Sequence, residues 1–316
     1  MFHRSTTDQS FTPLDLRDFY AAPEGAACWL MGGGPSLTRL PLAEIRASHI
    51  PIMAVNLAGQ GHLIPDFWTA YDPTARFLPS IYRSPRTLKF LHRRRSMDLL
   101  PGGTHKLCEC PGLVFFENEK RDFTHAFSPQ ANKILDWNDS LIQAIDILFH
   151  LGFRTLYLAG CELSIAPATA FIEHAAREGL EHHPGQPLRH FLEQCKSRQI
   201  APELSPNEVT GPQYHFDEAK PLAATLRTDE HYQRTVQLLR LSRKSLTQAG
   251  LRLVSVTPDS RLNDYFHYQP VAEVLTTLAA AAGSPELHRT RGLYTGQPLP
   301  PPPLRCPMRD LKAPTP

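Results

Sequence analysis

Three consecutive glycines, followed by a proline and a serine, are the part of this sequence with the clearest chemical meaning. Gly32, Gly33 and Gly34 end an apolar run, and Pro35 and Ser36 suit the first turn of a helix. Glycines let the backbone come close to a ligand, and the first N–H groups of a helix are free to bind an anion. The loop therefore predicts an anion site, whose usual occupant is a nucleotide phosphate.

The glycine loop departs from the two common phosphate-binding signatures. No Gly-Lys-Ser/Thr follows it, which argues against a Walker A motif, and the third glycine of the dinucleotide fingerprint is missing. A plain strand-to-helix turn is the alternative for this segment taken alone. If the loop holds phosphate, a valine at Gly34 is expected to weaken nucleotide binding far more than it lowers stability.

Polar side chains end three further apolar runs of the chain. Asn56, Asp72 and Glu162 each follow a run that predicts a buried strand. The carboxyl ends of parallel strands meet at one edge of a sheet, and ligands bind at that edge. We therefore expect these three residues to lie near the glycine loop. The alternative for each acid is that it only caps a helix or stabilises a turn.

The elements that must position these residues alternate between strands and helices, which predicts an α/β fold. We expect a Rossmann-like, mostly parallel sheet with helices on both faces and a long lid insertion. The expected strands span residues 26–31, 50–56, 65–73, 155–162 and 251–256, with shorter candidates at 87–91 and 105–110. The expected helices span residues 37–47, 140–151, 168–178, 187–196, 229–249 and 270–282.

Composition divides the chain into three parts. We expect residues 1–22 to be an N-terminal extension, residues 23–283 a nucleotide-binding domain and residues 284–316 a proline-rich flexible tail. Within the domain, residues 163–228 are rich in proline and histidine and interrupt the alternation of strands and helices. Long insertions at the ligand edge of a sheet are typically lids, so this segment is called the lid insertion.

Bulk properties limit the function classes. The chain has 316 residues, of which 41% are hydrophobic, and a formal net charge of +2, so it is not an electrostatic nucleic-acid binder as a whole. Six scattered cysteines without a Cys-x-x-Cys pair predict neither a zinc site nor a disulfide framework. No secretory signal and no membrane-spanning segment is evident, which favours a cytoplasmic protein.

The motifs occur in the order found in one superfamily. The glycine loop at 32–37 comes first, and strands ending in Asn56 and Asp72 follow it. A helix after Ser140 then leads into residues 151–162, and Val-Thr-Pro-Asp-Ser stands at 256–260. This set resembles bacterial lipo-oligosaccharide sialyltransferases, motility accessory factors of flagellin glycosylation, and 6-hydroxymethylpterin diphosphokinases. The resemblance covers residues ~25 to 265 and implies a Rossmann-like nucleotide-binding fold.

The resemblance also implies roles for residues at the nucleotide. Gly32, Gly34 and Ser36 match the loop that holds it, and Asn56 matches an asparagine that contacts it. Ser140 matches a serine beside the nucleotide.

Two acids and two other positions mark how this chain differs within the superfamily. Glu162 replaces an aspartate, and Asp72 stands where the sialyltransferases have asparagine and the accessory factors look acidic. Gly33 stands where the sialyltransferases have asparagine, and Ser164 replaces their lid tyrosine.

A catalytic base follows from the same resemblance. The sialyltransferases use a histidine on the lid, before the last helix and strand, as general base. His231 lies closest to that place, with Tyr214 and His215 as competitors. Imidazole suits this task because it titrates near neutral pH.

Three hypotheses remain open. The first is a glycosyltransferase-like enzyme that uses a nucleotide sugar and a glycan or small-molecule acceptor. The second is a diphosphokinase-like enzyme in which Asp72 and Glu162 hold Mg²⁺ against a nucleoside triphosphate. The third is a nucleotide-binding accessory protein without catalysis. Apart from Mg²⁺ in the second hypothesis, no metal site or cofactor is predicted.

Overall fold

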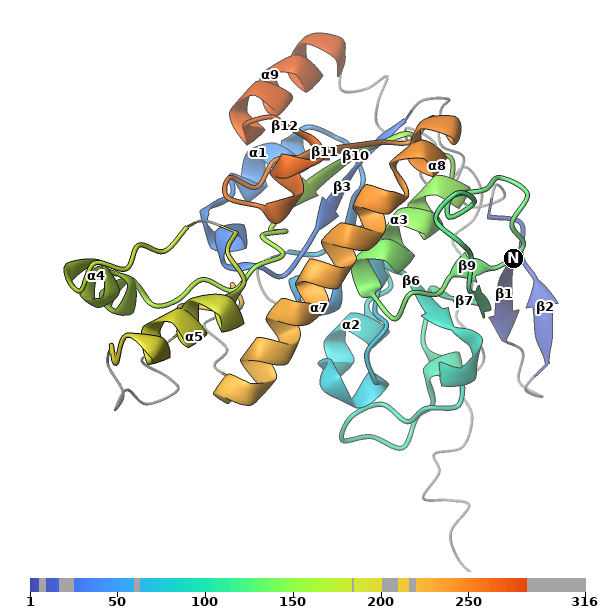
Figure 1. The fold of residues 1–316 in the computed structure, drawn as a ribbon. Coiled ribbons are helices and arrows are strands. Elements are labelled where there is room, and N and C mark those ends of the chain that lie inside the picture. Colours follow the sequence, from blue (N-terminus) through green and yellow to red (C-terminus); the bar gives the residue numbers. More distant parts are fainter. Residues whose placement is uncertain are drawn as a thin grey trace, which may run out of the picture.

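The computed structural model describes residues 1–5, 10–16, 26–59, 63–183, 185–200, 210–215 and 220–282. One large sheet lies at the centre and helices cover both of its faces (Figure 1). The predicted α/β fold with a mostly parallel sheet is therefore confirmed. The predicted tail lies outside the described residues, as do parts of the lid insertion and of the N-terminal segment.

The central sheet has ten strands in the order β12-β11-β10-β3-β4-β5-β6-β7-β1-β2. All pairings from β12 to β7 are parallel, and β1 and β2 are antiparallel additions at one edge. The strands are β1 (Phe2–Ser5), β2 (Phe11–Pro13), β3 (Ala27–Met31), β4 (Ile52–Val55), β5 (Phe67–Thr69), β6 (Leu88–His92), β7 (Leu113–Phe116), β10 (Thr155–Ala159), β11 (Arg252–Ser255) and β12 (His267–Tyr268). Two short strands, β8 (Asn118–Glu119) and β9 (Ile134–Leu135), pair separately.

The chain reverses its direction of travel across the sheet at β3. From β3 it runs outward to β7, and it then returns to place β10 on the other side of β3. The loops after β3 and β10 therefore leave the same edge in opposite directions, which opens a crevice between them. Gly32–Gly34 follow β3 and Gly160–Glu162 follow β10, so the topology brings these two segments together.

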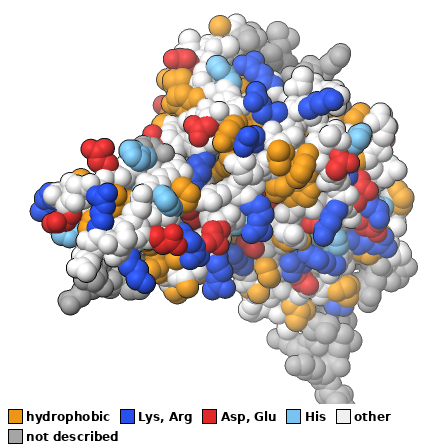
Figure 2. Space-filling view, in the orientation of Figure 1, with side chains coloured by type: hydrophobic (Ala, Val, Ile, Leu, Met, Phe, Trp, Pro, Cys, Tyr) orange, Lys and Arg blue, Asp and Glu red, His pale blue; other side chains and the backbone are white. Residues whose placement is uncertain are grey.

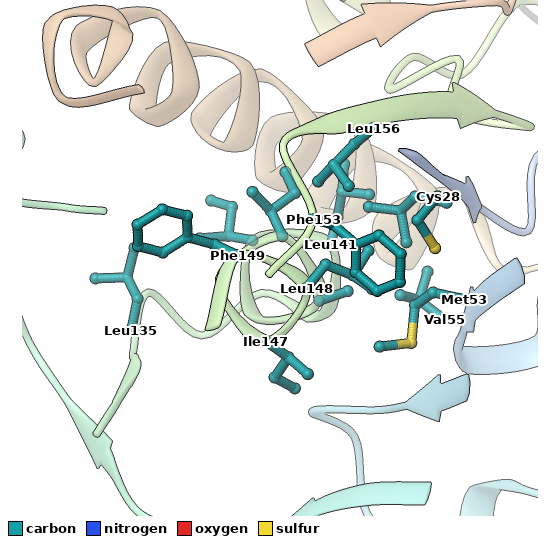
Figure 3. Packing of buried hydrophobic residues seen from close by; sticks show 14 of the residues in the cluster. Cys28, Met53, Val55, Leu135, Leu141, Ile147, Leu148, Phe149, Phe153 and Leu156 are labelled. Atoms are coloured by element: carbon teal, nitrogen blue, oxygen red, sulfur yellow. The ribbon is translucent and has the colours of Figure 1, made fainter. Parts of the chain in front are cut away.

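Alternate residues of the central strands supply the two core layers. Cys28 and Leu30 pack in one buried cluster with α3, α7 and α8, whereas Trp29 and Met31 pack in another with α1, α2 and α9. In Figure 3, Phe153 and Leu141 of α3 lie on the side of Cys28, whereas Phe149 points toward Leu135. This alternation follows from the two-residue period of a strand. The helices are α1 (Leu42–Ala47), α2 (Pro79–Arg83), α3 (Ser140–His150), α4 (Thr169–Arg177), α5 (Leu188–Ser197), α7 (Leu222–Leu241), α8 (Arg243–Gln248) and α9 (Val271–Ala282).

Helix α3 begins and ends as its sequence predicts. The Asp139 side chain caps it by accepting a hydrogen bond from the Ile142 N–H at 2.8 Å. Gly152, with φ of 100°, follows the last turn, where a left-handed residue is favoured. Ten of its eleven residues are buried, so the helix is held on all sides.

Two predictions near the amino-terminal half were wrong in detail. The expected helix over 37–47 is a 3₁₀ helix over Pro35–Arg39 and a separate α1, because Pro41 interrupts the run. The expected strand over 105–110 contains a 3₁₀ turn at Leu107–Glu109, in which the Glu109 carboxylate accepts from the Lys106 N–H at 3.0 Å. That local bond competes with strand pairing.

The helix expected over 229–249 is longer and divided. Helix α7 already begins at Leu222. The prediction missed its first turns because they face α5 rather than the sheet and so lack the apolar pattern of a helix that packs on a sheet. At Ser242 the helix breaks, and the Ser242 hydroxyl donates to the Leu238 carbonyl at 2.9 Å.

The lid insertion carries α4 and α5, which project to one side of the sheet (Figure 1). They share a small core of their own, formed by Phe171, Ala175, Leu180, Phe191, Cys195 and Ile200. The segment 1–22, expected as an extension, contributes β1 and β2 to the central sheet. Among the described residues, no helix combines the length and the apolar character that crossing a membrane requires.

Candidate functional site

A cavity of about 300 Å³ lies where the loops after β3, β4 and β10 meet. This is the crevice that the reversal of strand order creates. Of the predicted site residues, the cavity is lined by Gly32, Gly33, Gly34, Asn56, Asp72, Ser140, Glu162, Tyr214 and His231. Ser36 and His215 lie beside the glycine loop and are not among the described lining residues.

The glycine loop is fastened to the loop after β10 by its backbone. Gly32 N–H donates to the Ala159 carbonyl at 2.8 Å, and Gly34 N–H donates to the Gly160 carbonyl at 2.9 Å. Ser36 N–H donates to Oε1 of Glu162 at 2.7 Å. These three N–H groups therefore already have acceptors within the protein, in contrast to the expectation that the first N–H groups here are free for a ligand.

The glycines are required by packing rather than by unusual backbone angles. None of the three has a positive φ. A Cβ on Gly34 would overlap the Glu162 carboxylate, and one on Gly32 would overlap the Gly160 carbonyl. A Cβ on Gly33 would meet Tyr214 at an ordinary 3.7 Å. This overlap adds a cost in stability that the prediction for Gly34 did not include.

His231 and Asp139 form a charged hydrogen-bonded pair in the cavity. His231, on α7, lies with Nε2 2.9 Å from Oδ2 of Asp139. Oδ2 also accepts from the Thr235 hydroxyl at 2.8 Å, while Oδ1 caps α3 through Ile142. The carboxylate is thus held from three directions, and it fixes the imidazole ring in turn.

The pair shifts both proton equilibria. The hydrogen bond to Asp139 raises the pKa of His231 above its ordinary value of 6.5. Burial is the largest single influence on Asp139 and alone would raise its pKa, but the hydrogen bond and charge of His231, together with the bonds from Ile142 and Thr235, outweigh it and lower the pKa from its ordinary value. The pair therefore favours a protonated imidazole beside an ionised carboxylate.

Ser140 and Asn56 join the α3 side of the cavity to the sheet. The Ser140 hydroxyl donates to Oδ1 of Asn56 at 2.8 Å and accepts from the Tyr71 N–H at 2.9 Å. The Tyr71 hydroxyl lies 2.6 Å from Oδ1 of Asn138. The predicted neighbours Asn56 and Ser140 are thus directly bonded to each other.

Backbone strain collects at the same cavity. Asn56 has φ of 51°, Asn138 of 54° and Leu163 of 49°, and all three line the cavity. Left-handed φ costs free energy for a branched side chain such as leucine, so the surrounding structure must impose it. Arg261 does so in part, because its Nη1 donates to the Leu163 carbonyl at 3.0 Å.

The two acids expected to hold Mg²⁺ are already engaged. Asp72 forms an ion pair with Arg76 at 2.8 Å, and Glu162 accepts from Ser36. Within the described part of the chain, no three histidine, cysteine or acidic side chains gather as metal ligands. In this arrangement both carboxylates therefore already have partners in the protein, whereas Oε2 of Glu162 has none among the described residues.

The remaining predicted residues lie at the lid insertion. The Tyr214 hydroxyl lies 2.6 Å from Nζ of Lys220, which also stands 4.7 Å from the centre of the Tyr214 ring. His215 N–H donates to the Gly33 carbonyl at 3.1 Å, so His215 supports the glycine loop. Of the two competitors of His231, only Tyr214 is part of the cavity wall.

Sequence analysis missed several participants. Asp139 was not among the predicted site residues, and Lys220 and Arg227, which also line the cavity, carried no signal. The buried ion pair between Arg261 and Asp229 of α7, at 2.8 Å, carried no signal either, and both residues also bond to the backbone of the lid insertion. Only the N-cap position of Asp139 could have marked it, since its partner is distant in sequence.

Comparison with known proteins does not identify the family of this chain. No protein-family model matches the chain, and no curated protein sequence matches it. Among solved structures, the chain is similar to the MAf glycosyltransferase from Magnetospirillum magneticum AMB-1, with 15% sequence identity and a TM-score of 0.39. The alignment covers 87% of this chain and 40% of that protein, so the chain spans less than half of its length. Likeness at this level identifies neither a substrate nor a site residue.

Proposed function

We propose that this protein is a nucleotide- or nucleotide-sugar-binding transferase of the glycosyltransferase type, similar to the sialyltransferases. The observation that carries the proposal is the His231–Asp139 pair, which lines a cavity at the switch point of a parallel sheet. Such switch points are the usual place for nucleotides in folds of this class. The cavity volume is at the lower end of the range for small-molecule sites.

In the proposed reaction, His231 takes the proton of an acceptor hydroxyl. The hydroxyl oxygen then attacks the anomeric carbon of the donor sugar, and the bond from that carbon to the phosphate oxygen breaks. Its electron pair leaves with the phosphate. Asp139 would hold the ring and stabilise the imidazolium that forms, as a carboxylate does for a histidine base in other enzymes. The acceptor would be a glycan or a small molecule.

Engagement of Asp72 with Arg76 and of Glu162 with Ser36 gives the diphosphokinase-like alternative no support. The remaining alternative is a non-catalytic accessory protein of surface-glycan or flagellin modification, which the experiment must distinguish from an enzyme. The scattered cysteines, without a Cys-x-x-Cys pair, favour a reducing compartment, so the cytoplasm is the proposed location.

Turnover of a panel of nucleotide sugars, with and without Mg²⁺, tests the proposal. His231→Ala should lower turnover by roughly 10² to 10⁴ while nucleotide affinity stays nearly unchanged, because only the base is lost. The exposed His267→Ala on β12 is the matched control and should be fully active. Full activity in His231→Ala would remove that residue as the base. Tight nucleotide binding without turnover of any donor would point to the accessory protein.

A further inference from the structure

The charges that line the cavity are not evenly matched. Two acids are paired, Asp72 with Arg76 at 2.8 Å and Asp139 with His231 at 2.9 Å. Three further charged side chains line the cavity and, within the described residues, take part in no ion pair: Glu162, Lys220 and Arg227. The excess negative charge is at the glycine loop, and the excess positive charge is on Lys220, two residues before α7, and on Arg227, in the second turn of α7.

Glu162 is built into the glycine loop. Its Oε1 accepts from the Ser36 N–H at 2.7 Å, and its Oε2 is buried without a hydrogen-bond partner among the described residues. The carboxylate lies so close to Gly34 that no Cβ fits there. It therefore stands at the position where the loop would otherwise meet the anionic group of a ligand.

A second anion next to this carboxylate would be repelled. Like charges in contact at a partly buried site are unfavourable, since water screens them less than at an open surface. Three of the loop N–H groups that could offset the repulsion, those of Gly32, Gly34 and Ser36, donate to protein acceptors instead. A ligand phosphate thus has little to gain at the glycine loop.

Lys220 and Arg227 offer the opposite environment. Nζ of Lys220 lies against Tyr214, and Arg227 is exposed, with its Nε donating to the Ala223 carbonyl of its own helix at 3.2 Å. Ammonium and guanidinium groups form strong charge-assisted hydrogen bonds with phosphate. The basic wall, defined as Lys220 and Arg227, is therefore the side of the cavity suited to a phosphate.

From this asymmetry we infer that Glu162 is an internal anion that fills the phosphate position of the glycine loop and thereby sets the ligand's orientation. The ligand places its phosphate on the basic wall and an uncharged, hydroxyl-bearing part at the loop. This inference rests on the proposed function, namely that the cavity binds a nucleotide or nucleotide sugar. It assigns specificity to Glu162 and phosphate binding to Lys220 and Arg227.

Calorimetric titration with nucleosides and their 5′-monophosphates, for the four common bases, tests the inference. The quantity compared is the affinity ratio of monophosphate to nucleoside. In the double variant Lys220→Met with Arg227→Met this ratio should fall about tenfold or more, because charge-assisted bonds to phosphate are lost. Glu162→Gln keeps an acceptor for Ser36 and should leave the ratio within about twofold of wild type.

The exposed pair Arg243 and Lys244 on α8 provides a control with the same loss of charge. Arg243→Met with Lys244→Met should leave the ratio unchanged. A ratio that rises about tenfold in Glu162→Gln would overturn the inference, because the phosphate would then lie beside that carboxylate. An unchanged ratio in the basic-wall variant would overturn it as well, even if Glu162→Gln fails to fold. Wild-type protein that binds none of the probes would instead remove the proposed function.

Discussion

The Glu162 carboxylate leaves no room for a side chain at Gly34, so a substitution there tests folding rather than binding. We predict that Gly34→Ala lowers the free energy of unfolding by about 1–3 kcal/mol, the usual cost of forcing an extra methyl into a packed site. Gly33→Ala is the control, since its Cβ would meet Tyr214 at 3.7 Å and the Ala58 nitrogen at 3.8 Å, both ordinary contacts, and it should cost less than about 1 kcal/mol. Urea denaturation of both variants measures the difference.

A double variant separates the two contacts at Gly34. Adding Glu162→Ala to Gly34→Ala should recover part of the loss, and the remainder would come from the Gly160 carbonyl. Equal stability of Gly34→Ala and the wild type would show that the glycine loop is not packed as described.

The His231–Asp139 pair should make stability depend on pH. The pKa of His231 is raised in the folded protein, so its contribution is fully present below pH 6.5 and is lost as pH rises through the raised pKa. The lowered pKa of Asp139 keeps that carboxylate ionised throughout this window. We therefore predict that the stability difference between wild type and His231→Gln is largest near pH 6 and shrinks by pH 9.

Urea unfolding at a series of pH values from 6 to 9 checks this prediction, and His267→Gln serves as the exposed control. A difference that grows with pH would contradict the assigned direction of the shift.

At the scale of elements, the lid insertion is joined to the body through one buried ion pair. Arg261 and Asp229 are both nearly inaccessible, with 6% and 2% of their side chains exposed. Asp229 accepts from the N–H groups of Ile165 and Leu188, and Arg261 donates to the Gly185 carbonyl. The positions of α7 and of the chain on either side of α4 thus depend on the same two charges.

We predict that Arg261→Met lowers the free energy of unfolding by about 3–5 kcal/mol, because it leaves the Asp229 carboxylate buried without its partner. A matched pair lies nearby, since Arg189 on α5 contacts Glu230 on α7 with 50% and 42% of the side chains exposed. Arg189→Met should cost less than about 1 kcal/mol. Denaturant unfolding compares the two, and similar losses would contradict the assigned role of burial.

The elements also show what sequence can and cannot predict. Asn56, Asp72 and Glu162 were located at one edge because apolar runs identify strands and parallel strands share a carboxyl edge. The partner of His231 was not identified, because Asp139 is 92 residues away and the contact depends on how α7 is rotated on α3. The direction of the Glu162 side chain, into the loop rather than toward a ligand, is likewise set by packing and not by spacing.

At the scale of the whole molecule, the asymmetry of charge is local to the cavity. On the face shown in Figure 2, basic and acidic side chains are interspersed. This pattern agrees with a net charge of +2 and gives no broad field for a polyanion. The site therefore depends on a few fixed charges at the reversal of strand order, where the topology brings distant segments together.

The sheet also extends beyond the nucleotide-binding domain expected from sequence. Strand β1 pairs with β7, and Phe2 is 8% exposed, with its ring 5.6 Å from that of Phe90. Deleting residues 1–13 would remove this aromatic contact from the core and open the backbone edge of β7.

We predict that the chain lacking residues 1–13 melts roughly 5–10 °C lower and aggregates more readily, since loss of a buried Phe costs about 3–5 kcal/mol. The chain ending at Ala282 is the control. The described core clusters use no residue beyond Leu278, and the removed segment is rich in proline without apolar periodicity. It should melt within about 2 °C of the full chain and keep its ligand affinity. Calorimetry of the three proteins measures both changes. If the shortened carboxyl end lowered the melting temperature as much as the amino-terminal deletion, the tail would have to dock on the domain and add to its core.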